Sequence, residues 1–268
     1  MKVFITGASS GIGAALAAEY AKRHPGPGTF MGLASRSSER LHELQERLQN
    51  TYHVQCTIYP LDVRDSVALS DAAKDFMLQS GAPDVVIASA GVSRGTLTEL
   101  SEDHAAFQAV LDINLMGMVH TFQPFISTMR GNPNQECRGK LVGIASVAGI
   151  RGLPGAGAYS ASKAGVIAYL ESLRVEMAAA NIAVTTIAPG YIRTPMTDVN
   201  QYKMPFLMDV DVAAKKFVTA IEHKRRFVVI PWQMGWLARI MRFIPPAVWD
   251  FAMKKAPYKK RLYWDWLS

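Results

Sequence analysis

Tyr159 and Lys163 form the one Tyr-x-x-x-Lys pair of the chain, in a stretch whose apolar spacing predicts a helix over residues 158–180. Residues four apart on a helix lie on the same face, one turn from each other. A free tyrosine has a pKa of about 10, and a nearby ammonium lowers it by favouring the phenolate. The pair therefore predicts a phenol that exchanges a proton near neutral pH, as the interconversion of a carbonyl and an alcohol requires.

Two further polar residues fit the same chemistry. Ser146 follows a strand predicted over residues 140–145, where its hydroxyl can orient a substrate oxygen and stabilise charge on it. Asn114 interrupts an apolar run in residues 101–129, where we expect one long helix, and its amide can fix a water that links Lys163 to solvent. Each residue alone has an ordinary explanation as a buried or solvated polar group, but all four together predict a catalytic set.

A glycine-rich turn, Thr-Gly-Ala-Ser-Ser-Gly-Ile-Gly, joins a strand predicted over residues 2–6 to a helix predicted over residues 11–24. Its glycines permit a tight turn, close approach of the backbone to a pyrophosphate, and close packing of the helix on the sheet. Free N–H groups and the helix dipole then face the anion. An ordinary glycine-rich turn is the alternative. The predicted phosphate contacts are Gly7, Ser9, Ser10, Gly11, Ile12 and Gly13.

The cofactor preference is read after the second predicted strand, residues 29–34. NAD binders tend to place an acid there to bind the ribose hydroxyls, but this chain has Ser35, Arg36 and Ser37. A guanidinium suits a 2′-phosphate, and the two hydroxyls add possible donors. We therefore predict NADP(H) rather than NAD(H); a solvated surface charge at Arg36 is the alternative.

Seven short β-rich runs alternate with longer helical patterns. The other strands are predicted over residues 53–59, 84–89, 140–145, 183–188 and 226–230, and the other helices over residues 37–50, 66–79, 101–129, 158–180 and 210–223. This order predicts an α/β fold: a doubly wound (Rossmann) parallel seven-stranded sheet with helices on both faces. Residues 1–231 would form this domain, and residues 232–268 a C-terminal helical extension. Ligands in such folds bind beyond the carboxyl ends of the strands.

These motifs resemble those of the short-chain dehydrogenase/reductase family over residues 1–230, in the order of that family's Asn-Ser-Tyr-Lys set. The resemblance implies that Asn114, Ser146, Tyr159 and Lys163 are catalytic and that the protein is a homodimer or homotetramer. It also implies cofactor contacts at Asp62, Val63, Ala90, Gly91, Tyr159, Lys163, Pro189, Gly190, Ile192 and Thr194. One motif departs: the family's Asn-Asn-Ala-Gly is Ala-Ser-Ala-Gly at residues 88–91, which removes two side-chain amides near the cofactor.

Residues 191–209 predict a functional loop, because they are long and contain prolines and bulky apolar side chains without a convincing long helix. We expect this loop to act as a lid, with Val92, Leu153 and Tyr191 lining the pocket beneath it. Few charges are available there, which favours an apolar carbonyl substrate.

The basic charge of the chain is concentrated at its C-terminal end. Residues 203–268 hold 13 Lys+Arg against 5 Asp+Glu, a balance of +8 that contrasts with −1 for residues 1–202, and all five tryptophans lie in this end. The apolar face expected around Trp236 and Ile240 would cover the chain's own pocket or a subunit interface, lie on an anionic membrane, or bind an acidic protein or nucleic acid. Nucleic acid is the partner that we expect least.

The composition predicts a cytoplasmic protein, associated with membranes only through the C-terminal segment. Two cysteines outside any redox or metal spacing and six scattered histidines predict no metal site. The function expected is reduction of a hydrophobic ketone or aldehyde by NADP(H), or oxidation of the matching alcohol, with Tyr159 as general acid or base. The alternatives are an acyl-carrier-linked 3-oxoacyl reductase and a cofactor-binding regulator without turnover.

Overall fold

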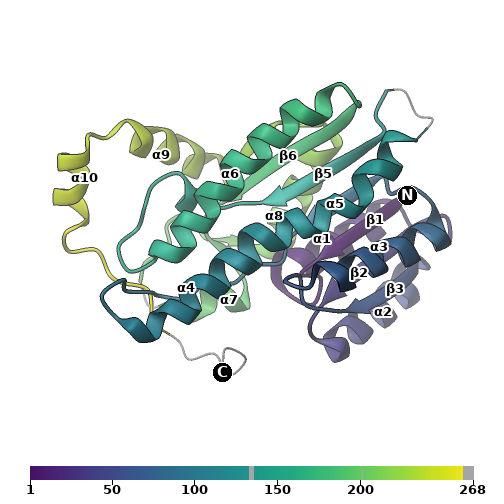
Figure 1. Ribbon diagram of the computed structural model, residues 1–268, viewed down its shortest axis with the longest axis horizontal. Coiled ribbons are helices and arrows are strands. Elements are labelled where there is room, and N and C mark those ends of the chain that lie inside the picture. The colour runs from purple at the N-terminus through teal and green to yellow at the C-terminus, as the bar shows by residue number, and fades with distance from the viewer. Residues whose placement is uncertain (133–135, 201, 262–268) are drawn as a thin grey trace.

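A parallel sheet of seven strands, in the order β3-β2-β1-β4-β5-β6-β9, runs through the centre of the molecule (Figure 1). The computed structural model describes residues 1–132, 136–200 and 202–261. The strands are β1 (Lys2–Thr6), β2 (Phe30–Ser35), β3 (Gln55–Pro60), β4 (Val85–Ala88), β5 (Gly139–Ile144), β6 (Ile182–Pro189) and β9 (Phe227–Ile230). All seven predicted strands are present, which confirms the predicted fold class.

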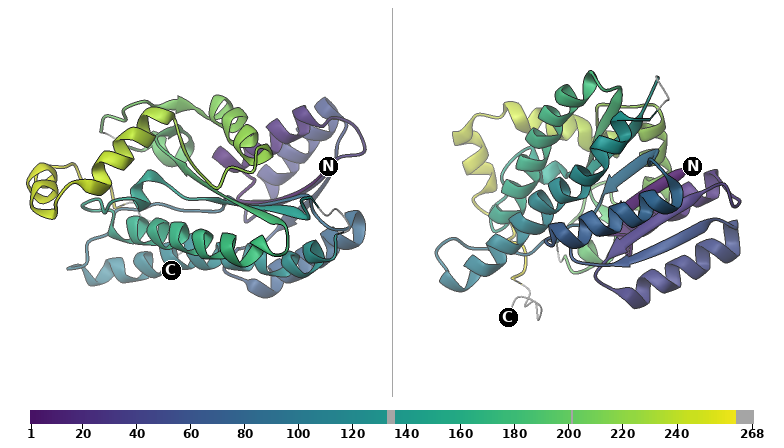
Figure 2. Two further views of the ribbon diagram at one scale, coloured as in Figure 1. Left: turned by 90° about the horizontal axis from the view of Figure 1, so that it is seen from above. Right: turned by 45° about the vertical axis from the view of Figure 1, so that its right-hand side comes forward.

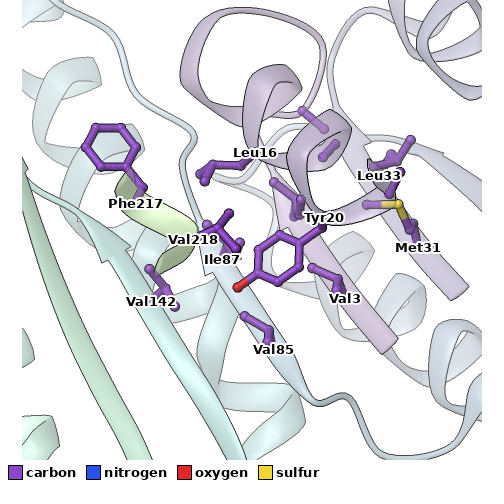
Figure 3. Close-up of a cluster of buried hydrophobic side chains, with 14 of the residues drawn as sticks. Val3, Leu16, Tyr20, Met31, Leu33, Val85, Ile87, Val142, Phe217 and Val218 are labelled. Carbon is purple, nitrogen blue, oxygen red and sulfur yellow. The ribbon is translucent and has the colours of Figure 1, made fainter. Parts of the chain in front are cut away.

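Helices cover both faces of this sheet (Figure 2). One face carries α1 (Gly11–Arg23), α2 (Ser38–Tyr52) and α8 (Val210–Glu222); the other carries α3 (Ser66–Ser80), α5 (Gly117–Arg130) and α6 (Gly157–Ala178). Side chains of a strand alternate between faces, so Val3 and Ile5 pack on the first side and Phe4 on the second. Figure 3 shows the first core, where Tyr20 lies against Val3 and Val85.

The winding of the sheet reverses at β1, which pairs with β2 on one side and β4 on the other. All the strands are parallel, so their carboxyl ends lie along one edge. Thr6, Ser35 and Ile144 end their strands at this edge. A crevice at such a reversal is where α/β folds bind ligands, which places the predicted site at this edge.

The single helix expected over residues 101–129 is wrong in detail. A short 3₁₀ turn (Ser101–Asp103) leads into α4 (His104–Leu111), then a π-helical turn, η2 (Asp112–Met116), and then α5. The extra residue of a π turn rotates the side chains that follow it. Apolar spacing averages over such a turn and therefore did not reveal it.

Two short features give structure to the loop of residues 191–209. Strand β7 (Ile192–Arg193) pairs with β8 (Met208–Asp209), and α7 (Pro195–Asp198) follows β7 with a capping box between Thr194 and Thr197. The first and last parts of the loop are therefore held together by backbone hydrogen bonds.

Beyond β9 the chain forms α9 (Trp232–Phe243) and α10 (Pro246–Met253), which extend away from the sheet at one end of the molecule (Figures 1 and 2). Residues 256–261 then run back toward the start of α4. No helix within the described residues is long and apolar enough to cross a bilayer. The rest of the predicted extension, residues 262–268 with Trp264 and Trp266, lies outside the described residues.

Candidate active site

A cavity of about 350 Å³ opens along the carboxyl edge of the sheet, at the reversal beside β1. The predicted cofactor contacts all line it. They are Gly7, Ser9, Ser10, Gly11, Ile12, Gly13, Ser35, Arg36, Asp62, Val63, Ala90, Gly91, Tyr159, Lys163, Pro189, Gly190, Ile192 and Thr194, and Ser146 joins them. One site therefore gathers residues that are spread over most of the chain.

The glycine turn has the close packing expected of it. Gly7 has a φ of +71°, and a Cβ there would lie 2.6 Å from the backbone nitrogen of Ala90. A Cβ on Gly13 would overlap the carbonyl of Gly7, so α1 packs directly on the turn. Ser10 is the N-cap of α1 but makes no side-chain capping bond. The first N–H groups of α1 therefore remain available to an anion in the cavity.

Arg36 stands at the end of β2 and lines the cavity together with Arg40, one helical turn further on. Sequence reasoning missed Arg40, although its position four residues after Arg36 was a usable signal. Ser37 also lines the cavity, but its hydroxyl accepts a bond from the backbone nitrogen of Arg40 and so caps α2. Two guanidinium groups are thus carried by the wall that follows β2.

Asp62 is held by a neighbouring arginine. Its carboxylate accepts hydrogen bonds from the backbone nitrogen of Arg64 at 2.9 Å and from the guanidinium at 2.8 and 3.1 Å. Partial burial acts in the opposite direction, but the bonds from Arg64, aided by the charge of Arg36, hold the pKa of Asp62 below its usual value. The carboxylate is therefore fixed and ionised at the cavity wall.

Tyr159 and Lys163 lie near the start of α6, with the Lys163 ammonium 5.9 Å from the centre of the Tyr159 ring. Burial raises the pKa of the phenol, and a hydrogen bond with the Ser146 hydroxyl opposes that rise. Burial also lowers the pKa of Lys163 to about 8, and its Nζ donates to the carbonyl of Ile144 at 2.8 Å. The phenol, the Ser146 hydroxyl and the ammonium all line the cavity. The lowered pKa expected for Tyr159 is not found, because burial of the phenol raises its pKa.

Asn114 lies behind this group and is not among the residues that line the cavity. Its amide oxygen accepts from the backbone nitrogen of Val92 at 2.8 Å, and its amide nitrogen donates to the Val92 carbonyl and to the Ser162 hydroxyl. The π-helical turn η2 presents the amide to both partners. Asn114 thereby joins the segment after β4 to α6, directly beneath Lys163.

The model of the short chain dehydrogenase family matches residues 1–204, which contain every residue of this cavity. The chain belongs to the short-chain dehydrogenase/reductase family. It is therefore an oxidoreductase of the type that acts on alcohol and carbonyl groups.

Two relatives in sequence support the family assignment, and one solved structure shares the fold. An uncharacterized oxidoreductase of Myxococcus xanthus is 33% identical over 94% of this chain and 95% of its own. A 2-dehydro-3-deoxy-L-rhamnonate dehydrogenase (NAD(+)) of Sphingomonas is 34% identical over 72% of this chain and 73% of its own. An alcohol dehydrogenase of Thermococcus sibiricus, solved in complex with 5-hydroxy-NADP, shares the fold with a TM-score of 0.74 and 24% identity over 85% of this chain and 95% of its own.

One charged residue beside Tyr159 of this short-chain dehydrogenase was not foreseen. Lys259 places its Nζ 5.7 Å from the centre of the Tyr159 ring and donates to the Ser93 hydroxyl at 2.7 Å. Lys259 is a charged group beside Tyr159 that the expectation of few charges near the pocket did not include. Lys259 lies far from Tyr159 in the sequence, and no local motif linked the two. Among the described residues no group of three His, Cys, Asp or Glu side chains is placed to hold a metal ion.

Proposed function

We propose that this short-chain dehydrogenase reduces a hydrophobic ketone or aldehyde with NADPH, or oxidises the matching alcohol with NADP⁺. The observation that supports this most strongly is the single cavity that joins the glycine turn, two arginines and the Tyr159–Ser146–Lys163 group. A dinucleotide bound in this cavity would have its phosphates at the glycine turn and its nicotinamide near the Tyr159 phenol.

The donor set fits the cofactor part by part. The N-terminus of α1 has no side-chain cap, so its free N–H groups suit the pyrophosphate. Gly7 packs closely on Ala90, and its lack of a side chain would let the cofactor approach the backbone of the turn. Arg36 and Arg40 suit a 2′-phosphate, because guanidinium groups bind phosphate oxygens with two parallel bonds. Residues 189–194, of which Ile192 is buried, would border the nicotinamide.

The bound nicotinamide supplies or accepts the hydride. Tyr159 then gives its phenolic proton to the carbonyl oxygen during reduction, or removes the alcohol proton during oxidation. Ser146 shares a hydrogen bond with that phenol and would hold the substrate oxygen beside it. Lys163 keeps a positive charge close to the phenol, which favours the phenolate left after proton transfer. Asn114 acts through its neighbours by fixing Val92 and Ser162.

The proposal is tested by NADPH consumption with a set of apolar ketones and aldehydes, each assayed with the wild type and with Tyr159→Phe. We expect turnover by the wild type and a loss of about 10³-fold or more in Tyr159→Phe, because the ring stays while the proton donor is removed. Arg36→Asp should shift the preference from NADPH toward NADH. Full activity in Tyr159→Phe, or a wild-type preference for NADH, contradicts the catalytic or the cofactor part respectively.

We also propose that α9 and α10 bind an anionic membrane surface. Phe243 and Phe251 are 85% and 84% exposed, and Trp232, Trp236 and Ile240 are also exposed on the same two helices. Arg239, Arg242, Lys254 and Lys255 accompany them. A second copy of the chain would have to bury this basic charge against itself, whereas an anionic bilayer complements both the apolar and the basic side chains.

The oligomeric state stays a prediction from the family resemblance. We expect a homodimer or homotetramer in solution, and light scattering coupled to size-exclusion chromatography measures it.

A further inference from the structure

Residues 256–261, here named the C-terminal tail, cross the two loops that flank Tyr159. The backbone nitrogen of Gly95, in the loop after β4, donates to the Lys260 carbonyl at 2.9 Å. A Cβ on Gly155, in the loop before α6, would lie 2.8 Å from the Tyr258 side chain. The two loops are also joined to each other, because Thr96 pairs with Ala156. The tail therefore packs closely on both of the loops beside Tyr159.

A buried carboxylate holds the end of this tail. Arg261 donates to Asp103 at 2.8 Å and to Glu102 at 3.0 Å. Asp103 is also contacted by Arg94 at 3.4 Å and by the backbone nitrogen of Leu97 at 2.8 Å. Burial works against the ionised form, but these bonds and charges hold the pKa of Asp103 below its usual value. The ion pair between Arg261 and Asp103 thus fixes the tail, and substitution of either residue would break it.

Lys259 lies between Tyr258, which packs on Gly155, and Arg261, which is held by Asp103. Its ammonium and that of Lys163 are 5.7 and 5.9 Å from the centre of the Tyr159 ring. The hydrogen bonds of the two ammonium groups go to the Ser93 hydroxyl and to the Ile144 carbonyl. Within the part of the chain that the structure describes, no carboxylate forms an ion pair with either lysine. Two partly desolvated positive charges beside one phenol therefore call for a negative charge that the described residues do not supply.

We propose that Lys259 is a specificity residue that binds an anionic group, a carboxylate or a phosphate, on the carbonyl substrate. The inference rests on the proposed function, because it places the carbonyl of that substrate at Tyr159. Lys259 forms no covalent bond and moves no proton. The short distance from Lys259 to the Tyr159 ring requires the anion to lie only a few bonds from the carbonyl. The substrate class is then an amphiphile: an apolar chain with a carbonyl and an anionic group at one end.

The test compares oxo acids of medium chain length with their methyl esters and with ketones that carry a phosphate, using kcat/KM with NADPH. We expect the wild type to prefer the acid or the phosphate over the matched ester by about 10- to 100-fold, the value of a charge-assisted hydrogen bond. In Lys259→Met this ratio should fall to about one, chiefly through a higher KM for the anion. Lys259→Arg should keep part of the preference. The anion is identified by which compound, the oxo acid or the ketone with a phosphate, gives the higher kcat/KM.

Lys260→Met is the matched control, because it removes the same charge from the adjacent, exposed side chain and should leave the ratio as in the wild type. Calorimetric binding of the acid and the ester to the complex with NADP⁺ gives a readout that needs no turnover. Equal binding of acid and ester, or equal losses on both in Lys259→Met, overturns the proposal. Turnover of esters alone would overturn it while leaving the proposed function standing. If no carbonyl compound is reduced in a Tyr159-dependent manner, the proposed function fails, and the binding arm still decides on Lys259.

Discussion

Lys163 shows at the level of one residue how the proposed catalytic role and stability oppose each other. Lys163 is only 5% exposed, and its ammonium donates a hydrogen bond to the Ile144 carbonyl. Burial lowers its pKa to about 8, which means that the folded chain disfavours the protonated form that the proposed reaction would use. The charge is therefore kept beside Tyr159 at a cost in folding free energy.

Lys163→Met should make the protein more stable at pH 7 and inactive. The wild type carries the penalty below pH 8, where the folded and unfolded chains are both protonated at this residue. The penalty shrinks between pH 8 and the unfolded pKa of about 10.4, because the folded chain loses its proton first. We expect the variant to gain about 1–3 kcal/mol at pH 7 and less than about 1 kcal/mol at pH 10. Urea unfolding at both pH values measures this difference.

The control for that comparison is Lys74→Met, which alters an exposed lysine on α3 and should change stability little at either pH. A Lys163→Met protein that is less stable than the wild type at pH 7, or a gain that is the same at both pH values, contradicts the account.

Spacing along the chain was sufficient to predict the geometry of those site residues that lie within one short motif. The glycine turn and the Tyr159–Lys163 pair are each contained in one short motif, and the spacing alone implies their geometry. Lys259 and Ser93 become neighbours only because the tail crosses the loop after β4. No periodicity or spacing encodes a contact between such distant segments, and so this part of the site required the structure.

At the level of the element, the π-helical turn η2 determines where Asn114 points. Its amide uses three hydrogen bonds to join the Val92 backbone to Ser162 on α6. Apolar spacing predicted one continuous helix over residues 101–129 and did not reveal the π turn, because one inserted residue changes the average period very little. The strand bounds were predicted to within two residues, since the β-rich runs are short and end at turn residues.

Asn114→Ala should destabilise the fold by about 2–3 kcal/mol, because it leaves the partly buried Val92 backbone groups and the Ser162 hydroxyl without this partner. It should also lower kcat, since Val92 and Lys163 border the same cavity. Equilibrium unfolding in urea and steady-state kinetics measure the two effects.

Gln108→Ala serves as the comparison, because it removes an exposed amide from the preceding helix α4 that bonds only to Asp112. Its effect should remain within about 0.5 kcal/mol. If Asn114→Ala lowers the free energy of unfolding as little as Gln108→Ala does, the hydrogen bonds of Asn114 do not stabilise the fold as proposed.

At the level of the whole molecule, the sheet was predictable and the placement of the C-terminal helices was not. Alternation of short apolar runs with helical patterns is sufficient to indicate a doubly wound sheet. The apolar face of α9 was also expected, but sequence could not tell whether it is covered. In the structure only Met234 and Ala238 of that helix are buried, and Trp236 and Ile240 face outward.

The membrane proposal predicts co-sedimentation of the full chain with anionic vesicles at low salt and not with neutral ones. Phe251→Ser, combined with reversal of Lys254 and Lys255 to Glu, should reduce binding by about tenfold or more. The reason is that apolar contact and attraction to the headgroups are both weakened.

The matched variant is Leu78→Ser, which removes an equally exposed apolar side chain from α3 on a different part of the surface. It should bind vesicles like the wild type. Binding that is equal in all three proteins, or concentration-dependent dimerisation that is lost in the Phe251 variant, would assign this face to something other than a bilayer.

The confinement of all five tryptophans to residues 232–266 has an optical consequence. Indole emission from this protein reports on the C-terminal end alone, and the seven-stranded sheet contributes none. Trp232, Trp236 and Trp249 stand on α9 and α10, so an unfolding curve followed by that emission would include the release of these helices. Circular dichroism would follow the sheet and its covering helices. Separation of the two curves would show, without any added label, that the two parts of the chain unfold independently.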